Sequence, residues 1–349
     1  MTELNYPVLA AFALLCTALL TLPLIPAILE WRRPSDVDAL LVLTNYTSDI
    51  GYFSKRLYAD VQAKLGRGVS TGFEAFDFVE FPVDDMDWPQ SRNRLISLQS
   101  IDTPFAIKNK NGQPLFVEGD LLTGPESIFS SVYSTGDIVL GHDSAVHDWA
   151  HADGLIQLGA SSVALRRVSA GKSIELGHEA WFERLNAPAI YFGYRAAQSA
   201  IRRSLPQQAS SLAELPGAIE QTPTLFLVRG DCVIEAGKTY SGSLIVTGFL
   251  TIGQDSTVEG DIKARDGLSL GRRAQVKGAI TCEKRIYLFK DARALGPVTS
   301  ESDILIGARS VIGLPDSLTT VSALNIIVEA GATVHGAVWA REVGMVKAE

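Results

Sequence analysis

The chain has 349 residues, of which 46% are hydrophobic and 8% aromatic, and its formal charge at pH 7 is -8. The apolar content together with 30 glycines favours many short strands and turns and excludes a disordered chain. The acidic balance, without a clustered Lys/Arg face, argues against nucleic acid as a partner, because neutralising phosphates requires such a patch.

An uncharged segment of 23 residues, 7–29, predicts a single transmembrane helix inside an anchor over residues 1–33. At about 1.5 Å per residue it is long enough for a hydrocarbon layer of roughly 30 Å. A cleavable signal peptide would carry positive residues before the apolar run, whereas Glu3 precedes it and Arg32 and Arg33 follow it. The positive-inside rule then places the rest of the chain in the cytoplasm, at the inner membrane. The predicted span includes Pro7, Phe12, Leu15, Leu20, Leu24 and Leu29.

Three cysteines occur, at Cys16, Cys232 and Cys282, far apart in the sequence. This spacing is neither a disulfide framework nor a set of zinc ligands. We therefore expect a reducing compartment, no metal and no cofactor.

Residues 34–118 show no repeat and predict a small α/β cap domain. Segment 38–44 is typical of a buried strand, and 73–83 alternates apolar and acidic residues like a half-exposed strand. Between them, residues 48–65 carry apolar residues at the spacing of one helix face, which predicts a helix ending at Gly66.

A repeat of eighteen residues begins near residue 120. Gly141, Gly159 and Gly177 stand eighteen apart, inside "DIVLGH", "LIQLGA" and "SIELGH". This first block covers 119–193. Residues 194–224 break the register and predict a helical, flexible connector. A second block, 225–349, resumes the period, and together the blocks predict roughly ten coils.

Within each repeat of eighteen residues, apolar positions recur every six residues in two series. Each six-residue unit therefore supplies two inward residues with one outward residue between them. That is a very short strand with period-two alternation. Three such strands form a triangular coil, so the sequence predicts a mainly β fold: a parallel β-solenoid of undetermined handedness. Glycine is expected at corners that need a positive φ or a close backbone approach.

The pattern "LTIGQDSTVEGDIKARDGLSLGRRAQVKGAI" resembles the bactofilins, polymer-forming bacterial cytoskeletal proteins with a triangular β-helix core. The resemblance covers residues 225–338 well and 120–193 more loosely. It implies assembly end to end without nucleotide, often at the inner face of the membrane, as a scaffold for envelope or polysaccharide machinery. The segment at 34–118, the second block and the connector depart from that family's pattern.

A solenoid's last coil presents unpaired backbone groups, which another coil can complete. Only ten residues follow Trp339, too few for a substantial cap, so the C-terminal end is the expected surface for self-association. The residues predicted at this end are Ile326, Val328, Val334, Val338 and Trp339.

A coil of eighteen residues made of three six-residue units is also typical of the hexapeptide-repeat acyltransferases, which use a histidine as general base. The segment "HDSAVHDWAHAD" (142–153) is the one place in the sequence where histidines and aspartates cluster as a catalytic or binding site would require. The solenoid register turns its histidines outward on different faces or corners, which favours a partner patch over a catalytic site. The predicted patch is His142, His147, His151, Asp143 and Asp148.

We therefore expect a non-enzymatic, membrane-anchored scaffold that binds itself and positions envelope or polysaccharide-assembly proteins. Two alternatives stay open. One is an acyltransferase-like enzyme, and the other is a docking subunit of a membrane polysaccharide synthase without self-assembly.

Overall fold

The computed structural model describes residues 6–25, 50–67, 76–79, 93–108, 112–193, 195 and 208–348. The chain divides into two compact units, 1–48 and 49–349. In the first unit, helix α1 (Tyr6–Thr21) is followed by the 3-10 turn η1 (Leu22–Leu24). Phe12, Leu15, Leu20 and Leu24 of the predicted span are all exposed there.

The predicted transmembrane span is not confirmed. Helix α1 has 16 residues, which at about 1.5 Å each is shorter than a hydrocarbon layer of roughly 30 Å. It gives way to η1 at Leu22, where a proline at the start of the turn has no N–H to continue an α-helix. Within the described residues no helix is long and apolar enough to cross a membrane, and Leu29 lies outside them.

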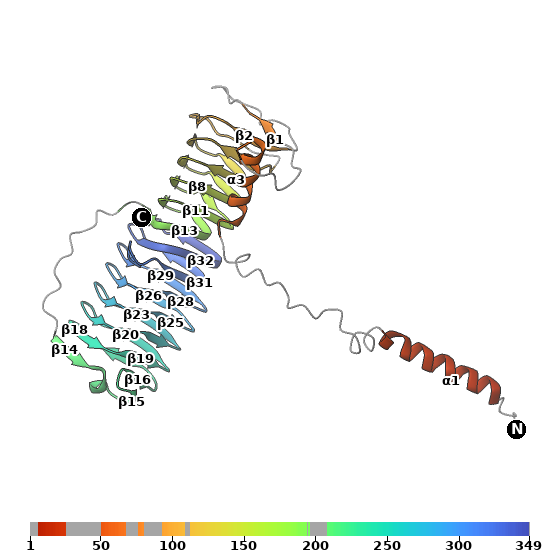
Figure 1. The fold of residues 1–349 in the computed structure, drawn as a ribbon. Helices are drawn as coiled ribbons and strands as arrows, with labels where there is room; N and C mark the ends of the chain where they lie inside the picture. Colours follow the sequence, from red (N-terminus) through yellow and green to blue (C-terminus); the bar gives the residue numbers. More distant parts are fainter. Residues whose placement is uncertain are drawn as a thin grey trace. The chain divides into compact units, whose positions relative to one another are not determined.

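The second unit contains a β-solenoid of about 13 turns, drawn in Figure 1. The first block comprises β1 (Phe76–Phe78), β2 (Arg94–Ser97), β3 (Ile101–Asp102), β4 (Leu115–Val117), β5 (Leu121–Thr123), β6 (Ile128–Ser134), β7 (Ile138–Leu140), β8 (Ala145–Ala152), β9 (Leu155–Leu158), β10 (Val163–Ala164), β11 (Arg167–Ala170), β12 (Ser173–Leu176) and β13 (Trp181–Phe192).

The second block comprises β14 (Gln208–Ser211), β15 (Ala218–Thr222), β16 (Leu225–Val228), β17 (Cys232–Ile234), β18 (Lys238–Ser241), β19 (Ser243–Val246), β20 (Phe249–Ile252), β21 (Thr257–Val258), β22 (Ile262–Ala264), β23 (Gly267–Leu270), β24 (Gln275–Val276), β25 (Ile280–Cys282), β26 (Ile286–Leu288), β27 (Arg293–Ala294), β28 (Val298–Ser300), β29 (Asp303–Ile306), β30 (Val311–Ile312), β31 (Thr319–Val328) and β32 (Thr333–Val346).

The eighteen-residue coil is confirmed. Leu250 pairs in parallel with Leu268, which pairs with Ile286, each one coil further along. The two inward series are buried along the second block: Leu250, Ile252, Ser256, Val258, Ile262, Ala264, Leu268, Leu270, Ala274, Val276, Ile280, Cys282, Ile286, Leu288, Ala292, Ala294, Val298, Ser300, Ile304 and Ile306. Equivalent residues stack on one another, so one continuous core runs along both blocks.

The corners depart in part from the expectation for glycine. In the second block the left-handed corner position is taken by Asp255, Arg273, Asp291 and Arg309, with φ between 56° and 62°. Glycine stands instead where coils approach closely: a Cβ at Gly253 would lie 2.5 Å from the backbone nitrogen of Ala236. Close approach, more than positive φ, therefore explains the spacing of these glycines.

The solenoid begins earlier than predicted, because much of the expected cap domain is itself solenoid. Strand β1 pairs in parallel with β2, β2 with β4, and β4 with β6. These additional coils raise the predicted ten turns to about 13. The interval between coils is irregular here, which is why the repeat is hard to find in the sequence. Segment 38–44 lies outside the described residues.

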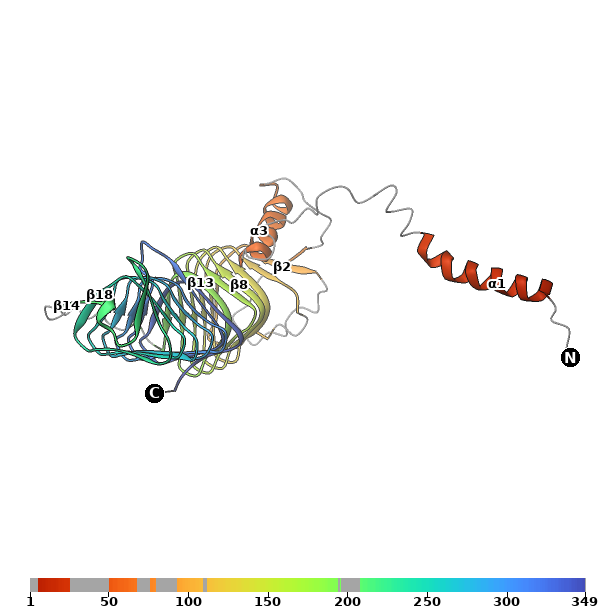
Figure 2. The same ribbon diagram turned by 90° about the horizontal axis from the view of Figure 1, so that it is seen from below.

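The predicted helix at 48–65 is confirmed as α3 (Tyr52–Lys64). It lies against the outer side of the first block, as Figures 1 and 2 show. Leu57 and Val61 of the helix are buried in a second apolar cluster with Ile96, Phe116 and Tyr133 of the strands. Aromatic side chains that would otherwise be exposed on this face are thereby covered.

The connector between the blocks contains β-structure and a 3-10 turn in its described part. Residues 196–207 lie outside the description. After them come β14, the turn η2 (Leu212–Glu214) and β15, which folds back antiparallel on β16. Leu212 and Leu215 are buried and cover the outer end of the second block's core.

Candidate functional site: the joint between the two solenoid blocks

The last coils of the two blocks meet end to end. Strand β13 pairs antiparallel with β32, with Leu185 opposite Val338, Ile190 opposite Val334 and Phe182 opposite Gly344. These three pairs lie on three different faces of the triangular coil, because β13 pairs in turn with β10, β11 and β12, and β32 pairs with β30 and with two successive parts of β31. Each block therefore ends on the other, and Figure 1 shows β13 and β32 side by side.

Hydrogen bonds outside the paired registers also cross the joint. The Glu179 N–H donates to the Val346 carbonyl at 3.0 Å, and the Val346 N–H donates to the Ala180 carbonyl at 2.9 Å. His335 is buried, and its Nδ1 lies 2.9 Å from the Pro188 carbonyl oxygen. Because Leu185 and Val338 are also buried, the core passes through the joint without a break.

The joint corrects the predicted self-association surface. We expected the edge at the C-terminal end to be unpaired, but β13 of the same chain already pairs with it. Val334 and Val338 lie in this joint, whereas Ile326 and Val328 lie one coil inside it, on β31 between β29 and β32. Trp339 is 40% exposed on the side of the rod. The C-terminal end is thus closed within one chain.

The outer end of the second block keeps strand edges without a described partner. Among the strands that the structure describes, β17 pairs only with β20, and β15 only with β16. Ile219 on β15 is 44% exposed and Val233 on β17 is 62% exposed. Leu212 and Leu215 close the core at this end, but the backbone edges of β15 and β17 remain.

The predicted histidine and aspartate patch does not form one site. Leu140, Val146, Ala150 and Ala152 point inward as expected. At one corner, His142 Nδ1 lies 2.6 Å from Asp143 Oδ2, and both side chains are mostly exposed. The exposed His147 lies on β8, between that corner and Asp148, and His151 lies near the end of the same strand.

His151 belongs to a polar row on the face that α3 covers in part. Its Nδ1 lies 2.7 Å from the Ser169 hydroxyl and its Nε2 3.3 Å from Asp153 Oδ1. The Tyr133 hydroxyl donates to the same carboxylate at 2.8 Å, and burial, followed by this bond, raises the pKa of Tyr133. Ser169 is only 5% exposed, so its hydroxyl is not available to a substrate.

The described residues hold no group of three or more His, Cys, Asp or Glu side chains that could bind a metal ion. Cys232 and Cys282 are buried, and burial raises the pKa of both thiols. Their thiolate forms, which are the nucleophiles and metal ligands, are therefore disfavoured.

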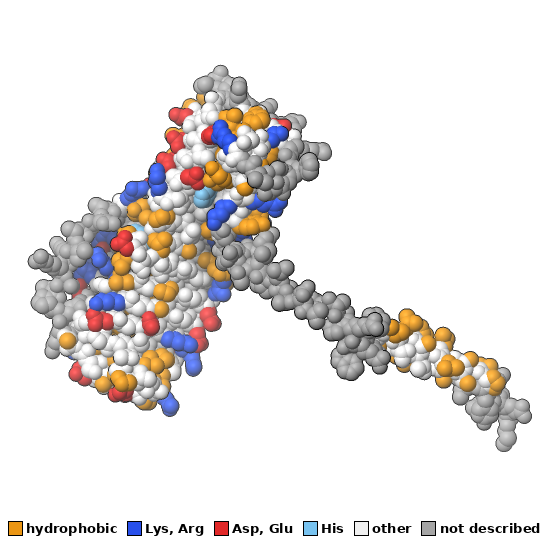
Figure 3. All heavy atoms as spheres, viewed as in Figure 1, with side chains coloured by type: hydrophobic (Ala, Val, Ile, Leu, Met, Phe, Trp, Pro, Cys, Tyr) orange, Lys and Arg blue, Asp and Glu red, His pale blue; other side chains and the backbone are white. Residues whose placement is uncertain are grey.

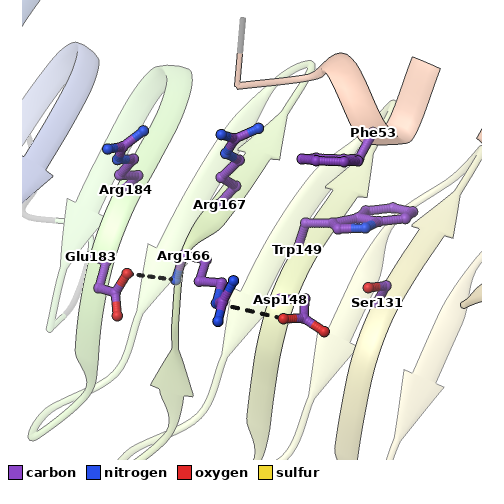
Figure 4. A pocket seen from close by; sticks show the side chains of 8 residues that line it. All are labelled: Phe53, Ser131, Asp148, Trp149, Arg166, Arg167, Glu183 and Arg184. Atoms are coloured by element: carbon purple, nitrogen blue, oxygen red, sulfur yellow. Dashed lines mark hydrogen bonds and ion pairs between the residues drawn. The ribbon is translucent and has the colours of Figure 1, made fainter. Parts of the chain in front are cut away.

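A pocket of about 730 Å³ lies beside the joint on the first block. Figure 4 shows its lining: Phe53, Ser131, Asp148, Trp149, Arg166, Arg167, Glu183 and Arg184. Asp148, from the predicted patch, accepts a hydrogen bond from Ser130 at 2.6 Å and pairs with Arg166 at 3.5 Å. Glu183 accepts a hydrogen bond from the backbone N–H of Arg166 at 3.1 Å.

Two arginines of this pocket stack on aromatic rings. The Arg167 guanidinium lies 5.0 Å from the centroid of the Phe53 ring, and that of Arg184 lies 4.1 Å from the Trp339 ring. Burial lowers the pKa of Arg184, and the positive charge of Arg167 lowers it further. The negative charge of Glu183 offsets part of this effect, so two like charges lie close together in a partly dehydrated setting beside one carboxylate.

Sequence reasoning missed these arginines, although the period contains a signal. Trp149 and Arg167 are partners in register, eighteen residues apart, and Val168 pairs with Leu185, which brings Arg184 beside Arg167. Placing outward residues, as well as inward ones, on the coil would have aligned the three. The contribution of Phe53 from α3 could not be found in this way, because nothing in the period relates the helix to the coils.

Comparison with known proteins gives no relative: no family model, no curated protein and no solved structure matches this sequence.

Proposed function

We propose that this protein is a non-catalytic scaffold. In this proposal its solenoid associates with further copies and positions components of the cell envelope or of polysaccharide assembly. The observation that supports self-association is the joint, in which one solenoid end of this chain pairs with another along all three faces. Pairing between solenoid ends is thus compatible with the backbone and core of this sequence.

Since the C-terminal end is closed within the chain, the proposed contact moves to the outer end of the second block. The edges of β15 and β17 offer backbone donors and acceptors there, and exposed strand edges are templates for pairing with another chain. Association through such edges adds hydrogen bonds but little core burial, because Leu212 and Leu215 already cover the core. We therefore expect weak, concentration-dependent assembly.

The side chains around the solenoid support a scaffold more than an enzyme. The predicted histidines have separate partners, since His142 contacts Asp143 and His151 contacts Ser169, whose hydroxyl is buried. Figure 3 shows Lys/Arg and Asp/Glu side chains interspersed over the visible face of the second block. Several of them pair one coil apart, such as Lys277 with Glu259 at 2.6 Å and Lys284 with Asp266 at 2.7 Å. Such rows suit a solvated rod.

The resemblance to bactofilins and the location at the inner membrane belong to this proposal as predictions. Fractionation of cells that express the tagged full chain tests the location. Recovery in the membrane pellet that resists high salt and yields to detergent would support it, and recovery in the soluble fraction would contradict it.

The assembly state of the full chain tests the scaffold directly, by light scattering across a concentration series together with negative-stain microscopy. Lysines at an edge strand oppose pairing, so Ile219→Lys with Val233→Lys should reduce the growth of mass with concentration. Phe289→Lys is the matched control, because Phe289 is 50% exposed in the middle of the second block. This variant should assemble like the wild type.

Two results would overturn the proposal. A chain that stays monomeric at all concentrations would leave the docking-subunit alternative. A closed trimer that is indifferent both to concentration and to the two lysines would favour the acyltransferase alternative.

A further inference from the structure

We infer that the pocket beside the joint binds a phosphorylated small molecule, with Arg167 and Arg184 holding the phosphoryl group. This site is independent of the proposed assembly, since it lies on the first block and the strand edges considered above lie at the far end of the second. The inference depends on the order of the side chains along the rod, on their charge and on the size of the pocket.

The relevant side chains form one outward row across the joint. Trp149 pairs with Arg167, Arg184 stands beside Arg167 on the next strand, and Arg184 pairs with Trp339 of the second block. Neighbouring rungs of a sheet are about 4.8 Å apart. Two guanidinium groups are therefore held one rung apart between two indole rings, and the joint is what completes the row.

Neither guanidinium has a carboxylate partner within salt-bridge distance among the residues that the structure describes. Elsewhere on the rod the pattern is different, since Arg273 makes two hydrogen bonds of 2.6 Å to Asp255 and Arg285 one of 2.7 Å to Asp303. Arginine stacks through its planar face and donates from its edge. Stacking on Phe53 and Trp339 thus leaves the edges of Arg167 and Arg184 able to bind an anion.

Two like charges lie close together at this place, which favours an anionic ligand between them. Burial and the charge of Arg167 lower the pKa of Arg184, whereas the charge of Glu183 raises it, and the net shift is downward. An anion between the two guanidinium groups would replace their repulsion with two charge-assisted attractions. Phe53 stands in the first turn of α3, and the positive end of the helix dipole adds to the potential for an anion there.

A phosphoryl group fits the two arginines better than a carboxylate does. One guanidinium fork already satisfies the two oxygens of a carboxylate, whereas a phosphate monoester has three terminal oxygens and up to two charges to share between two forks. Asp148 and Glu183 line the same pocket and limit its positive charge. A ligand of modest charge is therefore expected, not a long polyanion.

The pocket is larger than a phosphate ion. Its volume of about 730 Å³ lies within the roughly 300–1,000 Å³ of small-molecule sites. Trp149 and Phe53 present aromatic surface on which a sugar or a nucleobase can stack. We therefore expect a nucleoside diphosphate to bind more tightly than pyrophosphate, and pyrophosphate more tightly than inorganic phosphate.

Calorimetric titration of the full chain with UDP, ADP, pyrophosphate and inorganic phosphate tests the inference. Arg167→Gln and Arg184→Gln should each weaken binding at least tenfold, because a hydrogen bond to a charged group is lost. Arg272→Gln is the control, since Arg272 is exposed on the second block, away from the pocket. Asp148→Asn should change affinity in the opposite direction, tightening binding about threefold by removing a competing negative charge.

A second experiment, with vesicles that contain phosphatidic acid, distinguishes a lipid headgroup from a soluble phosphorylated compound as the ligand. Binding to these vesicles but not to the soluble probes would point to a lipid headgroup as the source, provided that Arg167→Gln abolishes it. Because Arg184 packs on Trp339 at the joint, circular dichroism and a melting curve accompany each variant. If Arg184→Gln unfolds, Arg167→Gln and Asp148→Asn still decide the question.

Two outcomes would overturn the inference. One is the absence of saturable binding by any of these probes at millimolar concentration. The other is binding whose affinity is the same in the wild type, in Arg167→Gln and in the control Arg272→Gln, because the arginines of the pocket would then not hold the ligand.

Discussion

The two solenoid blocks share one core and differ on their outer sides. In the middle of the second block Leu244, Ile262, Ile280 and Val298 follow one another at a constant eighteen residues. At the start of the first block the corresponding steps vary, since Leu95 pairs with Leu115 and Leu115 with Val132. The core tolerates this variation because extra residues are accommodated between strands while inward residues keep their stacking.

The outward positions differ more strongly. On the first block Ile96, Phe116 and Tyr133 form an apolar row that α3 covers, and the arginine pocket lies beside it. On the second block the corner row Asp255, Arg273, Asp291 and Arg309 carries alternating charges. The inward pattern therefore specifies the solenoid, and the outward residues distinguish the blocks: the first carries the apolar row under α3 and the arginine pocket, and the second carries rows of paired charges along its sides.

The largest effect is expected from a charge placed in the joint. Val338 is buried opposite Leu185, so Val338→Asp should cost about 5 kcal/mol or more, because an unpaired carboxylate would be buried. A solenoid's stability depends on interfaces between neighbours. Urea unfolding should thus split into two transitions, one for each block.

Hydrogen exchange should locate the loss in β13 and β32. Val233→Asp, at a 62% exposed position, is the control and should change stability by less than about 0.5 kcal/mol. A single transition with an unchanged midpoint in Val338→Asp would contradict the joint.

A smaller and more local effect is expected where α3 covers the first block. Phe116 is fully buried, and its ring centroid lies 5.3 Å from that of Tyr133. Phe116→Ala should cost about 3 kcal/mol through lost burial and a cavity, and should expose α3 to protease. Limited proteolysis with mass spectrometry measures cleavage within 50–67. Phe289→Ala, at a half-exposed position, should leave cleavage unchanged, and equal cleavage of both variants would refute the covering role.

The smallest effect concerns the charged rows of the second block. The Asn325 hydrogen bond, with help from Arg285, holds the pKa of Asp303 below its ordinary value of 3.8. The stability that this carboxylate contributes is therefore present above pH 3.8 and is lost as the pH falls through the lowered pKa.

Asp303→Asn should accordingly destabilise the protein at pH 7 by less than about 1 kcal/mol, since solvent screens the pair, and should match the wild type near pH 2. Urea unfolding at the two pH values measures the difference. A larger deficit at low pH than at neutral pH would reverse the expected sign.

The positions that the eighteen-residue period determines could be predicted from the sequence. Inward residues such as Ile262 and Leu268 were identifiable because stacking requires them to recur, and α3 followed from its own helical spacing. The irregular coils before residue 119 were missed because their steps hide the repeat. The joint was missed for a different reason: the antiparallel pairing of β13 with β32 joins two ends that local pattern does not relate.

The candidate site residues show the same division between positions that the period relates and positions that it does not. The outward direction of His142, His147 and His151 followed from the register, and so did their failure to converge. The pocket needed the joint to bring Trp339 under Arg184, and α3 to bring Phe53 over Arg167. Contacts between separate elements carry this site, and a one-dimensional repeat does not encode them.

The most direct test of the account is a disulfide across the joint. Asn186 and Ala337 are partners in the antiparallel register, at a Cα separation of roughly 4.5–5.5 Å, which suits a disulfide. Oxidation of the variant with Asn186→Cys and Ala337→Cys should give an intramolecular link at monomer mass, identified by peptide mapping. The control variant combines Asn186→Cys with Thr281→Cys. Thr281 lies three coils beyond the coil that contains Ala337, so these two cysteines should not link within the chain. Links that form only between chains, or equally in the control, would contradict a solenoid joined end to end within one molecule.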